Sequence, residues 1–197
     1  MDTEIEAKFL AVNHDAMRTK LNNLGAICTY PMRQMRRKVF DFPDNHLNKQ
    51  HNGWVRVRDE GDKVTLSYKQ LDSRTLQGTK EVTVTADNFD TTCLLLEQLG
   101  LEAKSYQETK RESWELDGAQ IELDEWPWIK PYMEIEALSE EAVHAVADKL
   151  ELAMADALYG SVEIAYQAEY DVTDEEIDAL KTITFGDIPA SLKARKK

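Results

Sequence analysis

The stretch Glu4-Ile5-Glu6-Ala7-Lys8-Phe9 has the alternating pattern of a β-strand. Successive side chains of a strand point to opposite faces of a sheet, so Glu4, Glu6 and Lys8 share one face. The apolar residues between them share the other face. A surface strand shows the same alternation, so this stretch alone is weak evidence. It gains weight because strands with one charged face and one apolar face recur along the chain.

Length and composition indicate one globular domain, or one domain with a small appendage. The chain has 197 residues, of which 42% are hydrophobic and 31% charged. No apolar run approaches the length needed to span a membrane, and Met1-Asp2-Thr3-Glu4 lacks the basic start of a signal peptide. We therefore expect a cytoplasmic protein without a membrane partner. Cys28 and Cys93 lack metal-ligand spacing, and we expect reduced packing residues rather than a disulfide.

The distribution of charge points to a local anion site. The net charge is −13, which argues against a generic nucleic-acid-binding protein. Residues 30–80 nevertheless contain eleven Lys/Arg and six Asp/Glu, a net charge of +5, which leaves −18 for the remainder. The segment is either an anion site inside an acidic chain or a solvated charged face.

The most regular strands lie inside this basic segment. Strands are predicted at 54–58, 63–69 and 79–85, with turns at 59–62 and 72–78. Arg56 and Arg58 share one face of the first strand, Lys69 lies on the polar face of the second, and Glu81 on that of the third. This arrangement predicts an antiparallel meander.

Alternation and helical periodicity predict the remaining elements. Further strands are expected at 36–42, 109–116, 119–126 and 132–137, and helices at 13–25, 87–99 and 139–152. We expect residues 44–53 to form a polar loop in which His46 and His51 are exposed, with a metal role as the less favoured alternative. Thr173 and Glu176 fit the capping box of a short helix, and we expect the basic tail 193–197 to be disordered.

Together these elements predict an α+β fold with a closed antiparallel eight-stranded β-barrel. Amphipathic helices would cover the apolar faces outside, and the charged faces would meet across a lumen. Buried charges need opposite partners or a ligand, and a barrel of this size admits one small ligand. The expected occupant is a small anion held by Lys and Arg, with a divalent cation on the carboxylates. The barrel is predicted at 1–152, and a helical extension that packs on it or trails from it at 153–197.

Several motifs occur in the order found in the CYTH superfamily, the triphosphate tunnel metalloenzymes, and the resemblance covers residues 1–152. The matching residues are Glu4-x-Glu6-x-Lys8, Phe40-Asp41, Arg56-x-Arg58, Lys69, Glu81, Arg111 with Trp114, Leu123-Asp124 and Glu134-x-Glu136.

The resemblance implies a tunnel that binds a triphosphate group together with Mg²⁺ or Mn²⁺. By this resemblance the metal ligands would be Glu4, Glu6, Asp124, Glu134 and Glu136, with Glu122 a further candidate. Phosphate oxygens would be held by Lys8, Arg56, Arg58, Lys69 and Arg111, and Glu81 would orient these cations. Glu4, Glu6 and Lys8 would serve catalysis. Family members often carry a basic residue where this chain has Thr109.

Three functions remain open. The resemblance favours a metal-dependent hydrolase of tripolyphosphate, nucleoside triphosphates or thiamine triphosphate. The alternatives are a class IV adenylyl cyclase, which needs a base pocket for which 43–52 and 126–131 are candidates, and a non-catalytic polyphosphate-binding module. No P-loop or GxSxG motif supports another phosphate or hydrolase chemistry. The oligomeric state is expected to be a monomer or a homodimer.

Overall fold

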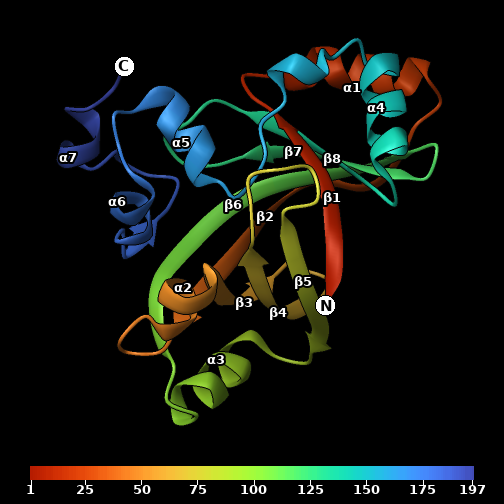
Figure 1. Ribbon diagram of the computed structural model, residues 1–197. Helices are drawn as coiled ribbons and strands as arrows, with labels where there is room; N and C mark the ends of the chain where they lie inside the picture. The colour runs from red at the N-terminus through yellow and green to blue at the C-terminus, as the bar shows by residue number, and fades with distance from the viewer.

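The fold is a closed barrel of eight antiparallel strands, described by a computed structural model of residues 1–197. The strands are β1 (Asp2–Phe9), β2 (Ile27–Asp41), β3 (Gly53–Asp59), β4 (Val64–Leu71), β5 (Thr79–Ala86), β6 (Glu102–Leu116), β7 (Ala119–Glu125) and β8 (Tyr132–Ala137). They follow the order β2-β3-β4-β5-β1-β8-β7-β6, and pairing of β2 with β6 closes the barrel (Figure 1). The predicted fold and its central meander are confirmed.

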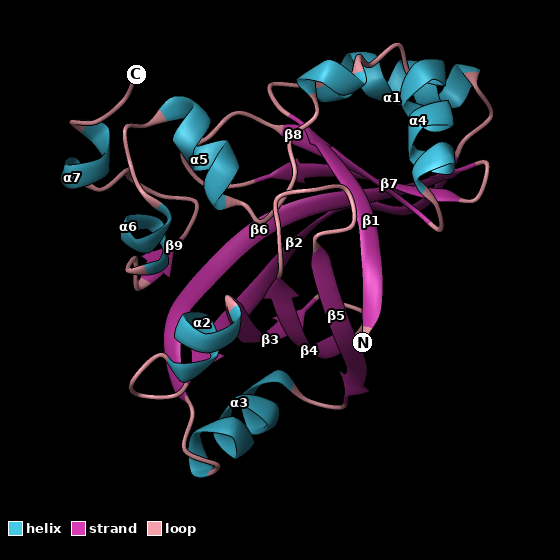
Figure 2. Cartoon of the chain, in the orientation of Figure 1, coloured by secondary structure: helices cyan, strands magenta, loops and turns pink.

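The longest helices pack outside the strands (Figure 2). α1 (His14–Asn23) and α4 (Glu140–Lys149) cover the apolar faces of β1, β7 and β8, and α3 (Phe89–Gln98) packs on Phe40 and Val57. Each of the three begins at an Asn or Ser whose side chain accepts a backbone N–H, which satisfies one donor of the first turn. One outward face stays uncovered, since Val82 and Val84 of β5 are exposed.

β2 and β6 are much longer than predicted. Each has fifteen residues, and the pairing runs from Ile27 opposite Glu115 to Asp41 opposite Glu102. Register shifts interrupt the ladder in three places. They break the two-residue periodicity on which the prediction depended, and residues 27–31 are exposed and show no alternation in burial.

The predicted loop at 44–53 contains a helix, α2 (His46–His51). The Asp41 carboxylate accepts the backbone N–H groups of Phe42, Leu47 and Asn48, so it caps this helix from the end of β2. A capping carboxylate five residues before the helix does not appear in a local sequence pattern. His46 and His51 are exposed, as expected, and no three His, Cys, Asp or Glu residues form a metal site there.

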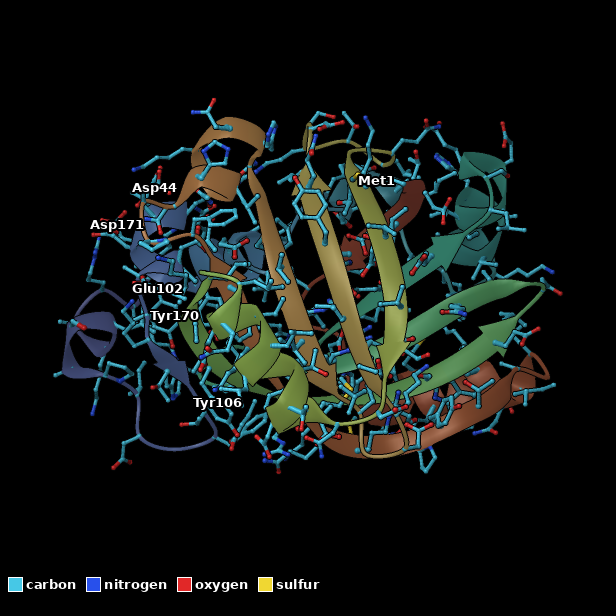
Figure 3. All side chains as sticks on the ribbon, turned by 90° about the horizontal axis from the view of Figure 1, so that it is seen from below. Met1, Asp44, Glu102, Tyr106, Tyr170 and Asp171 are labelled. Atoms are coloured by element: carbon cyan, nitrogen blue, oxygen red, sulfur yellow. The ribbon has the colours of Figure 1, made fainter.

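The C-terminal segment packs against the barrel. It contains η1 (Met154–Asp156), α5 (Glu163–Glu169), α6 (Asp174–Asp178), β9 (Thr182–Ile183) and α7 (Ala190–Lys193). β9 pairs in parallel with β6, and Figure 3 shows Tyr106 of β6 on the same side of the molecule as Tyr170 and Asp171. The segment forms its own apolar cluster with Trp126 and Tyr132. The capping box at Thr173 is confirmed.

The prediction that residues 193–197 are disordered is wrong. The Lys197 N–H donates to the Glu169 carbonyl, the Asp171 N–H donates to the Arg195 carbonyl, and Arg195 forms an ion pair with Glu176. These contacts join residues distant in sequence, which composition does not report. Cys28 and Cys93 are free, as expected, and Cys93 packs in the core beneath α3. Cys28 is exposed, so the prediction that it is a packing residue is wrong. None of the helices has the length and apolar character required to cross a bilayer.

Candidate active site

The interior of the barrel holds a cavity of about 790 Å³ to which all eight strands contribute side chains. Only nine of its 44 lining residues are hydrophobic, so the lumen is polar. Every predicted site residue except Asp124 lines it: Glu4, Glu6, Lys8, Arg56, Arg58, Lys69, Glu81, Arg111, Glu134 and Glu136, together with the further candidate Glu122. The alternation of charged and apolar residues explains this, because each strand turns its apolar face outward.

β1 and β8 bring carboxylates together around Lys8. Glu6 pairs with Glu136 across the ladder, and Lys8 pairs with Glu134. Lys8 Nζ lies 2.7 Å from Oε1 of Glu6 and 3.0 Å from Oε1 of Glu134. Although burial opposes both charges, these contacts raise the pKa of Lys8 and lower that of Glu134. The lysine stays protonated and fixes both carboxylates in place.

Arg111 lies among three carboxylates of β7 and β8. Arg111 Nε lies 2.7 Å from Oδ1 of Asp124 and 3.9 Å from Oε2 of Glu122. Arg111 Nη2 lies 2.8 Å from Oε2 of Glu134. Burial opposes its charge, but Asp124, Glu134 and Glu122 raise the pKa of Arg111. Asp124 is fully buried and does not line the cavity, and both of its oxygens accept hydrogen bonds from Arg111. In this structure Asp124 therefore orients Arg111, and its role as a metal ligand stays a prediction.

A second charged network joins β1, β4, β5 and β3. Lys69 Nζ lies 2.8 Å from Oε1 of Glu4 and 3.1 Å from Oε2 of Glu81, and Arg56 Nη2 lies 3.1 Å from Oε1 of Glu81. Burial raises the pKa of Glu4 to about 8. Despite burial, the hydrogen bond with Glu4 and the charges of Lys69 and Arg56 lower the pKa of Glu81. The two neighbouring carboxyl groups thus hold one proton near neutral pH.

Sequence reasoning missed Glu60, which was predicted only as part of a turn. Its buried carboxylate lies 2.6 Å from Nη2 of Arg58 and 3.4 Å from Nη2 of Arg33. Although burial opposes ionisation, Arg58 lowers the pKa of Glu60. Arg33, also missed, lies in the part of β2 that periodicity did not predict. Glu60 therefore lines the lumen from the hairpin between β3 and β4, beside Arg58 at the end of β3.

Sequence reasoning also missed Arg37 of β2. The alternation at 36–42 places Arg37 with Val39 and Asp41, and all three line the cavity, so parity could have identified the face. Arg37 Nη2 donates to Oγ1 of Thr109 at 3.0 Å. The hydroxyl at the position where a basic residue was expected therefore supports an arginine from the neighbouring strand.

The donor set of the lumen suits a hard divalent cation. Glu122 Oε2 is buried without a hydrogen-bond partner, and burial together with the charge of Glu6 raises the pKa of Glu136. No three His, Cys, Asp or Glu side chains converge into a ready-made metal cage. Mg²⁺ is usually bound by one or two carboxylates plus substrate phosphates, so the donors fit an ion shared with a phosphate ligand.

The aromatic run 126–131 is occupied by packing. Trp126 lies edge-on to Tyr166 with ring centroids 6.5 Å apart, and Trp128 Nε1 donates to the Gly186 carbonyl. Tyr166 Oη donates to the Pro127 carbonyl. The C-terminal segment therefore holds Trp128 and the edge of Trp126, while the ring of Trp126 still lines the cavity and is stacked by Arg37.

Comparison with known proteins agrees with this geometry. The CYTH domain model matches residues 2–164. No curated protein sequence matches the chain.

Several solved structures share the fold at low sequence identity. A putative adenylate cyclase from Vibrio parahaemolyticus superposes with a TM-score of 0.72 at 18% identity, covering 84% of this chain and 98% of its own. A protein from Pyrococcus horikoshii OT3 gives 0.65 at 21% identity, covering 78% and 93%. A putative adenylyl cyclase from Hippeastrum with a dominant triphosphatase activity gives 0.58 at 16% identity, covering 89% and 94%.

Proposed function

The chain belongs to the CYTH family, and on that premise we propose that it hydrolyses the triphosphate group of a small substrate with the help of Mg²⁺ or Mn²⁺. One observation carries the proposal: a single lumen of about 790 Å³ has cations on β2, β3, β4 and β6 facing carboxylates on β1, β7 and β8. Its volume is that of a small-molecule site. Glu136 lines the lumen without an ion pair, and a module that only bound anions would have no need of such a carboxylate.

The residues of the lumen divide the work by their chemistry. Arg56, Arg58 and Arg111 present planar guanidinium groups that bind two phosphate oxygens at once, and Lys69 adds a compact charge. Phosphoryl transfer depends mainly on alignment and neutralised charge, which a rigid barrel supplies. A divalent metal, held by Glu6, Glu134 and Glu136 together with phosphate oxygens, would neutralise charge and lower the pKa of a water molecule.

Two contacts at 126–131 support hydrolysis over cyclisation: Trp128 is held by the Gly186 carbonyl, and the guanidinium of Arg37 covers the ring of Trp126 on which a purine would stack. A cyclase must hold the adenine so that the ribose 3′-hydroxyl lies in line with the α-phosphate. A hydrolase needs only the phosphates and a water molecule.

The test is a substrate panel of tripolyphosphate, ATP and thiamine triphosphate with Mg²⁺, Mn²⁺ or EDTA. We expect metal-dependent release of phosphate, and chromatography of the ATP reaction should show mainly ADP. Cyclic AMP and pyrophosphate as the dominant products would replace the hydrolase by a cyclase. Tight binding of every substrate without turnover would leave only the binding module.

A Glu6→Gln variant tests the carboxylates directly. It keeps the shape of the side chain and removes one charge beside Lys8. We expect turnover to fall by at least about a hundredfold, since even the loss of outer-shell partners costs about ten- to a hundredfold. Glu97→Gln on the outer helix α3, whose side chain is 42% exposed, is the matched control. Equal activity of the two variants would remove Glu6 from the site.

A further inference from the structure

Arg37 differs from the other arginines of the lumen. Arg56 pairs with Glu81, Arg33 and Arg58 share Glu60, and Arg111 has three carboxylates. Lys8 and Lys69 each contact two carboxylates as well. Arg37, with 8% of its surface exposed, forms no ion pair with any carboxylate. It is therefore a buried cation without a counter-ion.

The surroundings of Arg37 hold the guanidinium in place without neutralising it. Nη2 donates to Thr109, and Cζ lies 4.6 Å from the ring centroid of Trp126. Nε is buried without a hydrogen-bond partner. Burial, followed by the charges of Arg56, Arg58 and Arg111, lowers the pKa of Arg37. Arg37 therefore brings an unpaired N–H donor and an unpaired positive charge to the lining of the cavity.

A buried charge of this kind is costly unless an opposite charge approaches it. We propose that Arg37 binds a phosphoryl group of the substrate directly, as an anion subsite on the side of the lumen covered by α5. Two contacts give the position of this subsite. Arg37 stacks on Trp126, which packs against Tyr166 of α5. Arg37 also lies opposite Gln107 of β6. The inference rests on the proposed function and deepens it.

This subsite differs in kind from the one around Arg111. The carboxylates of Arg111 are already bound to it, so a phosphate must compete with them or bring a metal. Arg37 has no such competitor. Because the ligand supplies the first counter-ion there, Arg37 adds more binding free energy per contact than a compensated arginine.

A purely structural role is the alternative. The stacking on Trp126 and the bond to Thr109 connect β2 with β6 and with the segment that follows β7, and a bracing arginine would stabilise the empty barrel. The two roles predict opposite effects on the ligand-free protein. Loss of a brace lowers the melting temperature, whereas loss of an uncompensated buried charge raises it.

The experiment compares Arg37→Gln with Arg36→Gln. Arg36 is the neighbouring residue, is exposed on the outer face and pairs with Asp59 at 3.1 Å, so it is a control of equal charge. Melting temperatures are measured without ligand, and binding of tripolyphosphate with excess Mg²⁺ is measured as the shift in melting temperature and as KM. For Arg37→Gln we expect a higher melting temperature without ligand and about ten- to a hundredfold weaker binding, the value of one or two charge-assisted hydrogen bonds. Arg36→Gln should bind tripolyphosphate as the wild type does.

The outcomes separate this inference from the function on which it rests. If the wild type neither binds nor hydrolyses tripolyphosphate, the proposed function is wrong and the subsite with it. If the wild type binds but Arg37→Gln binds equally well, the subsite alone is wrong. An Arg37→Gln protein that melts earlier or does not fold shows a brace and overturns the proposal. Arg37→Lys, which keeps the charge, should restore most of the binding.

Discussion

Arg111 and Arg37 lie in the same lumen, but their surroundings differ in charge balance. Three carboxylates surround Arg111, whereas a hydroxyl and an indole ring surround Arg37. A count of charges along the sequence treats the two residues alike. The comparison shows that the availability of a charge to a ligand depends on its partners, and that these partners come from other strands.

The difference has an energetic side. Removing one member of a buried ion pair leaves an uncompensated charge, while removing a charge that was never compensated relieves a cost. The ion pairs of Arg111 therefore contribute to the stability of the ligand-free protein. The charge of Arg37 contributes to stability only when a ligand is bound.

The largest expected effect is on stability at Arg111. Arg111→Leu leaves Asp124 buried without its cation and leaves Glu134 with Lys8 alone, and we expect a loss of about 3–5 kcal/mol in the free energy of unfolding, measured by urea denaturation. Lys110→Leu is the control, since Lys110 forms a half-exposed pair with Glu125 at 3.3 Å and should cost less than about 1 kcal/mol. Similar losses in both variants would show that the buried carboxylates around Arg111 do not depend on its charge for stability.

A smaller effect is expected from the ligand. A lumen with surplus charge is stabilised by an anion that binds only the folded state. Tripolyphosphate with Mg²⁺ at about 100 times its dissociation constant should add roughly 2.7 kcal/mol to the free energy of unfolding. Sodium chloride at matched ionic strength is the control. No change in melting temperature would show that the charged faces do not form a common binding lumen.

A third effect is a dependence of stability on pH, through Glu4. Burial raises its pKa to about 8, so the folded state binds this proton more tightly than the unfolded state, in which an ordinary Glu titrates near 4.5. The stabilisation is complete below the unfolded pKa and is lost as the pH rises through about 8. In EDTA, the melting temperature of the wild type should fall between pH 6 and 9 more than that of Glu4→Gln. Parallel curves for the two proteins would argue against a shared proton at Glu4 and Glu81.

The barrel itself could be predicted from the sequence because alternation is a local property. Alternate residues of a strand share one face, so the face on which each side chain lies follows from its position in the strand. This alternation correctly predicted a common lumen for five residues: Glu6, Lys8, Arg56, Arg58 and Glu134. The pairing of these residues could not be predicted, since it depends on register. Lys8 meets Glu134 only because β1 and β8 align at that residue.

Arg33, Glu60 and the order of the tail were missed for a related reason. The bulged ladder of β2 hides the alternation that leads to Arg33, and Glu60 lies in a turn, where side-chain direction does not follow parity. The tail is held by backbone hydrogen bonds to Glu169 and Asp171, which its basic composition does not indicate. Distant partners decide each of these cases.

The pairing of β1 with β8 has a consequence for how the chain folds during synthesis. Ile5 pairs with Ala137, so β1 leaves the ribosome more than a hundred residues before its partner strand β8. Such non-local pairing slows folding and leaves strand edges unpaired in the meantime. Charged side chains on an edge strand hinder pairing with other chains, and Glu4, Glu6 and Lys8 alternate along β1. The residues proposed to serve catalysis would thus also hinder pairing of the nascent strand with other chains until the barrel closes.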